Sequence, residues 1–182
     1  GTTAIAAQAM TNILENLNGM AAIGVGVGLM TIVGQCMGAD RKDEAVYYIK
    51  KLSVIAEVAI IVSCLLVFAL IRPVTVLGGM EPASAKMCFH MVTWITLVKP
   101  IVWTLAFVPA YGLRAAGDVK FSMITSCLVM WLCRFCLCVI LIRFLGFGPM
   151  GVWIGMFADW TVRAVIFTWR FHSRRWLRYK VI

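Results

Sequence analysis

Single ionisable residues lie inside long apolar stretches of this sequence, and they are the residues best placed for chemistry. They are Glu57, Lys99, Arg134, Asp159 and Arg163. A charged side chain at the centre of a bilayer costs about 2.5–3.5 kcal/mol on insertion scales, so such residues face a protein interior or an aqueous cavity and mark transport pathways. A carboxylate at this depth could carry H⁺ or Na⁺. The chain therefore has the pattern of a membrane transporter.

Depth along the expected helices suggests which of these charges meet. At about 1.5 Å per residue, Arg134 and Asp159 lie at one level of two antiparallel neighbours, so we expect an ion pair between them. Arg163 is one helical turn from Asp159 and could share its carboxylate. The network is either a structural clamp or a switch between transport states. Glu57 and Lys99 are also expected to pair near mid-depth, unless Glu57 lies nearer the interface and reaches solvent.

A polar face near the start of the chain supplies further candidates. Gln8, Asn12 and Glu15 follow a spacing of four and three residues, which places them on one side of a helix. That side either lines a cavity or begins a helix at the membrane interface. The expected residues of the substrate or ion pathway are Gln8, Asn12, Glu15, Glu57 and Lys99.

Composition excludes a soluble globular protein. Of the 182 residues 62% are hydrophobic and 14% are charged, and the mean hydropathy is +0.92, whereas about 25% of residues are charged in ordinary soluble domains. The net charge of +9 comes from basic residues that flank the apolar stretches, so we expect a lipid bilayer and no nucleic acid as partner. Cys133 and Cys136 form a CxxC spacing without a second pair, so we expect neither a metal nor a cofactor.

The elements that must position these residues are membrane-spanning helices, each needing about 20 mostly apolar residues. The sequence predicts an all-α membrane protein with five transmembrane helices, at about 3–37, 52–71, 87–113, 121–145 and 150–171. Pro73 should end the second helix, and Pro100 and Pro109 should kink the third. The glycines at 24, 26 and 28 predict close helix packing, and a bend that moves during transport is the alternative.

The distribution of Lys and Arg predicts the orientation of these helices. Three basic residues flank one side: Arg72, Lys86 and Arg143. Eleven flank the other: Arg41, Lys42, Lys50, Lys51, Arg114, Lys120, Arg170, Arg174, Arg175, Arg178 and Lys180. Because cytoplasmic loops carry the excess of Lys and Arg, we expect the C-terminus in the cytoplasm.

Four stretches carry a family resemblance. The segments GTTAIAAQAMTNI and TIVGQCMGADRKDEA resemble the GxxAxAA…VGQxxGAG region of multidrug and toxic compound extrusion (MATE) transporters. The segment YGLRAAGDVKFSM, with Arg114, Gly117 and Asp118, is similar to their LRxxGD turn, a cytoplasmic loop motif. The segment GVWIGMFADWTVRAVIFTWRFHSRRW resembles their closing helix. The sequence departs from the family pattern at Asp40 and Arg174, where a glycine is usual.

This resemblance implies a transporter of twelve helices in two lobes. Residues 1–182 would form part of the C-terminal lobe, helices eight to twelve, and would need the missing N-terminal lobe as partner. The beginning at Gly1, in sequence that already has helical character, also leads us to expect a fragment. The implied function is a secondary active antiporter of the plasma (inner) membrane, not an enzyme. It would export cationic or amphipathic drugs and toxins in exchange for Na⁺ or H⁺ by alternating access.

Two other functions remain open from the residues. A lipid-linked precursor flippase of the same superfamily would favour a wide basic cavity, whereas the charges here are mixed. An intramembrane enzyme would need a nucleophile or base with partners at one depth. His90 has no such companion in the sequence, and HExxH is absent.

Overall fold

The computed structural model describes residues 2–178, which form a helical bundle without a strand in that range. The elements in chain order are α1 (Thr2–Gly38), α2 (Lys42–Leu77), α3 (Pro82–Ala115), α4 (Val119–Val129), η1 (Met130–Leu137), α5 (Cys138–Arg143), α6 (Pro149–His172) and η2 (Arg175–Arg178). The segments α4, η1 and α5 together form one continuous span. Five helices of the described range are therefore long and apolar enough to cross a membrane, which confirms the predicted all-α membrane fold.

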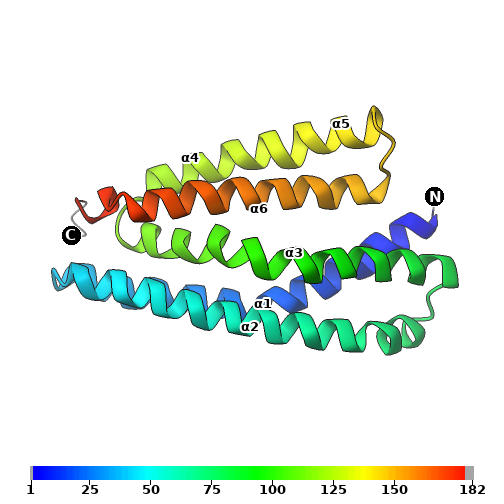
Figure 1. Cartoon of the computed structure of the whole chain (residues 1–182), viewed down its shortest axis with the longest axis horizontal. Coiled ribbons are helices and arrows are strands. Elements are labelled where there is room, and N and C mark those ends of the chain that lie inside the picture. The colour runs from blue at the N-terminus through cyan, green and yellow to red at the C-terminus, as the bar shows by residue number, and fades with distance from the viewer. Residues whose placement is uncertain (1, 179–182) are drawn as a thin grey trace.

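The helices run up and down, so that their connections alternate between two ends of the bundle (Figure 1). One end holds residues 39–41, 116–118 and 173–178, and we call it the basic end. The opposite end holds residues 78–81 and 144–148. The basic residues of the larger predicted group lie at or near the basic end, except that Lys180 is outside the described residues. The bundle thus has the charge asymmetry from which the orientation was predicted.

Packing joins two layers of this bundle. Helices α1, α2 and α3 pack on one another, α6 packs along α3, and the α4–η1–α5 span packs along α6 (Figure 1). Trp153, Trp160 and Phe167 of α6 are almost fully buried, which explains why this helix holds the two layers together. Large apolar side chains such as Leu65 and Ile101 remain exposed on the outside. These surfaces suit lipid or further helices of a membrane protein.

Helix α2 continues through Pro73 to Leu77, so its predicted end before this proline is wrong. Proline removes one backbone donor and leaves the carbonyl four residues earlier, that of Ala69, without its helical partner. Transmembrane helices tolerate such a proline, because the other backbone groups stay bonded within the helix. The Thr75 hydroxyl adds a bond to the carbonyl oxygen of Ile71, at 2.9 Å. Helix α3 likewise stays helical through Pro100 and Pro109.

The glycines of α1 differ from one another in their surroundings. Gly26 is buried, and a Cβ atom there would lie 2.6 Å from Cδ2 of Tyr111, so the ring packs directly on the α1 backbone. Gly24 and Gly28 have open space around them within the described part of the chain. Close packing is therefore confirmed for Gly26. For Gly24 and Gly28, the pair with GxxxG spacing, it stays a prediction, because both face away from the described helices.

Candidate functional site

A cavity of about 210 Å³ lies where α1, α3, η1 and α6 meet, and we call it the central cavity. Its lining combines polar and charged side chains with aromatic rings. The lining residues are Glu15, Asn16, Gly19, Ile23, Trp103, Phe107, Tyr111, Arg134, Met156 and Trp160. Only Glu15 and Arg134 of this set were candidates from the sequence.

An ion pair between α1 and α3 borders the central cavity. The Nζ atom of Lys99 lies 2.7 Å from Oε1 of Glu15 and donates a second hydrogen bond, of 3.0 Å, to the Glu15 carbonyl oxygen. Lys99 is fully buried, whereas the Glu15 side chain is 15% exposed. Gly19 leaves room for the ammonium, since a Cβ atom there would lie 3.4 Å from Nζ. The acidic partner therefore stays accessible from the cavity while the basic partner does not.

The expected pair between Glu57 and Lys99 is not formed, because Lys99 projects from α3 toward α1, whereas Glu57 of α2 faces a different side of α3. Glu57 lies against the side of α3 that presents Pro100, Ile101 and Thr104, in a separate cavity of about 320 Å³. Lys99 points to α1 instead. Depth alone could not distinguish Glu15 from Glu57 as the partner of Lys99.

The expected pair between Arg134 and Asp159 is also wrong. Asp159 is bonded to Arg163, its neighbour one turn along α6, with Nε and Oδ1 2.8 Å apart. Arg163 also donates from Nη2 to the carbonyl oxygen of Ser126 at 2.9 Å, which ties α6 to α4. Arg134 lies on η1, a π-helix whose i→i+5 bonds change the direction of its side chains relative to an α-helix. Its side chain lines the central cavity.

Gln8 and Asn12 lie beyond Glu15 on α1, toward the opposite end. The Gln8 side chain donates from Nε2 to Oδ1 of Asn12 at 3.3 Å and accepts from Nε1 of Trp153 at 3.1 Å. Gln8 and Asn12 line a second cavity, of about 450 Å³, with Pro149 and Val152 of α6. The polar side of α1 thus extends from this cavity to the central one. A role of these side chains in transport stays a prediction.

The loop motif at the basic end is fixed by a buried ion pair. Asp118 accepts from Nε of Arg170 on α6 at 2.7 Å, and their side chains are only 1% and 11% exposed. The Arg170 guanidinium lies 4.5 Å from the centre of the Phe121 ring. Gly117 has a φ of 93°, which suits glycine and allows the tight turn before α4. Arg114 instead covers the ring of Tyr111 at 5.6 Å.

Sequence reasoning missed Arg170 as the partner of Asp118 and missed the aromatic wall of the central cavity. Both had a signal. Asp118 is an acidic residue within the predicted basic flanks, so a partner among them was to be expected. Lys99, Trp103, Phe107 and Tyr111 repeat every four residues along α3, a spacing that places side chains on one side of a helix.

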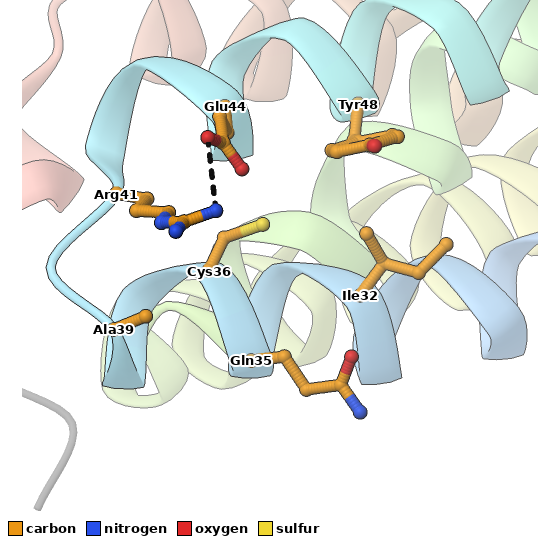
Figure 2. Close-up of a pocket in the computed structure, with 7 residues that line it drawn as sticks. All are labelled: Ile32, Gln35, Cys36, Ala39, Arg41, Glu44 and Tyr48. Atoms are coloured by element: carbon orange, nitrogen blue, oxygen red, sulfur yellow. Dashed lines mark hydrogen bonds and ion pairs between the residues drawn. The ribbon is translucent and has the colours of Figure 1, made fainter.

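A further cavity, of about 370 Å³, lies at the basic end between the last turns of α1 and the start of α2. Figure 2 shows Arg41 and Glu44 pointing toward each other near Cys36, with Nη1 and Oε1 3.4 Å apart. Both side chains are at least half exposed, so this pair contributes little to stability. No candidate residue lines this cavity. Within residues 2–178, no group of three or more His, Cys, Asp or Glu side chains is placed to hold a metal ion.

Comparison with known proteins identifies relatives of this arrangement. The family model described as MatE matches residues 1–140. The probable multidrug resistance protein NorM of Thermotoga maritima is 22% identical over 169 residues, which cover 93% of this chain and 36% of that protein. The uncharacterized transporter YisQ of Bacillus subtilis is 39% identical over 67 residues, 37% of this chain and 15% of that protein.

A second probable multidrug resistance protein NorM, from Rhodopseudomonas palustris, is 36% identical over 61 residues, 34% of this chain and 13% of that protein. The chain thus spans about a third or less of the length of these relatives. No solved structure matches it.

Proposed function

The chain belongs to the MatE family, and we propose on this basis that it forms most of the C-terminal lobe of a secondary active antiporter. The full protein would export cationic or amphipathic drugs and toxins in exchange for Na⁺ or H⁺ by alternating access. It would lie in the plasma (inner) membrane with its C-terminus in the cytoplasm. The N-terminal lobe of the same protein would complete the pathway.

The observation that carries this proposal is the Glu15–Lys99 pair at the edge of an aromatic cavity. Lys99 neutralises Glu15 in the structure, at an N–O distance of 2.7 Å. A proton, a Na⁺ ion or a substrate ammonium that binds the partly exposed carboxylate would compete with Lys99 for it. Because a ligand shifts a conformational equilibrium only through unequal affinity for two states, this exchange offers a means of coupling ion binding to movement of α1 against α3.

The names of the relatives also support a transport function. Two of them are named as probable multidrug resistance proteins and a third as a transporter. The helices of the chain also fit a multi-pass membrane protein. The aromatic rings of Trp103, Phe107 and Trp160 offer an apolar wall of the kind that amphipathic compounds bind.

Efflux of a fluorescent cation, ethidium, from cells that express the full-length transporter tests this function. Removal of the Na⁺ gradient and of the proton gradient, one at a time, should stop efflux in one case and so identify the coupling ion. Glu15→Gln should reduce efflux strongly. Glu44→Gln, which breaks the exposed pair with Arg41, is the matched control and should leave efflux unchanged. Efflux no faster than in cells with an empty vector would refute the proposal.

A further inference from the structure

We propose that a groove between α2 and α3 is a second binding site, separate from the central cavity, for amphipathic organic ammonium ions that reach it from the lipid. This inference rests on the proposed transport function and adds a place at which the exported cations bind. Its evidence is a carboxylate without a partner, that of Glu57, in a largely apolar groove that also contains a buried hydroxyl group without a partner.

The α2–α3 groove is the cavity of about 320 Å³ that Glu57 lines, and small-molecule sites occupy about 300–1,000 Å³. Most of its lining is apolar, from side chains such as Val58, Ile101 and Leu105. These side chains remain exposed on the outside of the bundle, Ile101 to 67%. In a bilayer this rim would face lipid, so a compound dissolved in the membrane could enter the groove directly.

Of the described residues that line the groove, Glu57 alone is charged. It is partly buried, and it has no hydrogen-bond or ion-pair partner within residues 2–178. Lys99, the base expected beside it, is bonded to Glu15 instead. Glu57 lies six residues beyond Lys51, about 9 Å into the apolar stretch of α2. A carboxylate at this depth is costly without a counter-charge, so the groove favours a cation.

A buried hydroxyl group on the facing helix also has no partner. Thr104 of α3 lines the groove and is 3% exposed, and its Oγ1 atom makes no hydrogen bond within the described range. The neighbouring hydroxyl of the groove, that of Ser53, instead donates to the carbonyl oxygen of Ile49 at 2.7 Å. A buried polar group without a partner is destabilising, so a ligand that bonds the Thr104 hydroxyl would remove this cost.

The chemistry of the groove favours an organic ammonium over a metal ion. A hard metal cation takes about six oxygen ligands, whereas the side chains here offer one carboxylate and two hydroxyl groups, of which Ser53 is already bonded. An ammonium group has up to three N–H donors, and its bond to a carboxylate is strengthened by charge. The expected ligand therefore places its ammonium between Glu57 and Thr104 and its apolar body along the rim.

The test is calorimetric titration of the full-length transporter in detergent at pH 7 with 2-naphthylmethylammonium and the neutral 2-naphthylmethanol. The transporter carries Glu15→Gln/Lys99→Met, which removes the carboxylate of the central cavity. Charge-assisted hydrogen bonds predict that the ammonium binds about 10-fold to 100-fold more tightly than the alcohol. Adding Glu57→Gln should abolish this preference. Glu44→Gln, the same change at an exposed position of α2, is the matched control and should preserve it.

Thr104→Val separates binding from packing. The variant keeps the shape of the side chain and removes a hydroxyl group without a partner, so the melting temperature should not fall. Affinity for the ammonium should fall about 3-fold to 10-fold, the effect of one hydrogen bond. A lower melting temperature with unchanged affinity would show that the hydroxyl only supports the helix pair, and would overturn its role in binding.

Two results would overturn the site itself. One is a preference for the ammonium that survives in folded Glu57→Gln. The other is equal affinity for the two compounds in the wild type, which needs no variant to fold and would favour a basic side chain elsewhere in the full-length protein as the partner of Glu57. Ethidium efflux reports separately on the proposed function: efflux without the preference refutes only this site, and the preference without efflux refutes only transport.

Discussion

The α6 side of the molecule and the central cavity hold their charges in opposite ways. Two arginines of α6 are paired with almost fully buried carboxylates: Arg163 with Asp159 of the same helix, and Arg170 with Asp118 in the turn before α4. In the central cavity Glu15 remains partly exposed and Arg134 has no partner within the described residues. A buried carboxylate that is paired with an arginine is not available to a ligand, whereas the partly exposed Glu15 and the unpaired Arg134 are. On the proposed function, the buried pairs along α6 anchor the lobe, whereas a ligand would bind at the central cavity.

Removing the Glu15 charge should have the largest effect on transport and stability, because it breaks the Glu15–Lys99 pair at the central cavity. Glu15→Gln leaves the fully buried Lys99 without its counter-charge, and breaking a buried pair in this way costs about 3–5 kcal/mol. We expect loss of ethidium efflux together with a lower melting temperature of the full-length transporter in detergent. Thermal unfolding followed by tryptophan fluorescence measures the second effect.

The double variant Glu15→Gln/Lys99→Met separates the two roles of this pair. Replacing both charges removes the unpaired ammonium, and such replacement is often neutral or stabilising. Stability should recover while efflux stays lost. Recovery of efflux together with stability would show that the pair only holds α1 to α3.

Breaking the Asp118–Arg170 pair should have a smaller effect, on stability alone. In Asp118→Ala the Arg170 guanidinium loses its carboxylate partner but keeps the Phe121 ring, 4.5 Å away. We expect a loss of about 3 kcal/mol of stability, the lower end of the range for breaking a buried pair, because the Arg170 side chain that remains is 11% exposed.

Transport by the same variant completes this comparison. Ethidium efflux per folded transporter should be unchanged in Asp118→Ala, because this pair lies at the basic end and does not line the central cavity. A slower efflux would mean that the basic end and the cavity are coupled.

The glycines of α6 and α1 also differ in how closely other atoms pack on them. A Cβ atom at Gly155 of α6 would lie 3.0 Å from the carbonyl oxygen of Cys133 and closer still to the Cys138 side chain. Overpacking of this kind costs about 1–3 kcal/mol. Gly155→Ala should therefore lower the melting temperature, whereas Gly28→Ala, which meets nothing within 4 Å, should not. Equal shifts would show that other helices of the full protein pack on the outward side of α1.

The sequence was a better guide to the helices than to the pairing of charges. Apolar length and basic flanks are local properties, so all five spans could be predicted. Which acidic side chain pairs with which basic one depends on the rotation of each helix about its axis. Glu57 of α2 and Lys99 of α3 were expected at one depth, but Lys99 points to Glu15 of α1 instead. The π-helical turn at Arg134 changes the direction of its side chain, and composition does not predict such a turn. The resemblance to transporters was read from motifs around Asp118 and Gly117, where backbone and ion pair jointly constrain the residues.

The smallest expected effect comes from the two positions where the sequence departs from the family pattern. Asp40 and Arg174 both have a positive φ, of 55° and 50°, the left-handed conformation that favours glycine. For an ordinary side chain this conformation costs about 1–2 kcal/mol, and less for Asp, whose short polar side chain tolerates it. Arg174→Gly should therefore stabilise the transporter by about 1 kcal/mol, and Asp40→Gly by less.

The two glycine variants also test how the basic end holds its turns. Asp40 has a compensating contact, since its carboxylate lies 3.2 Å from the Lys42 ammonium, and glycine would remove it. Thermal unfolding of both variants beside Asp40→Asn, which keeps the tolerance for positive φ but not the charge, distinguishes backbone strain from the ion pair. A larger gain at Asp40 than at Arg174 would contradict the argument from side-chain type. The left-handed turns would then be held by contacts beyond the ion pair rather than by the intrinsic preference of their residues.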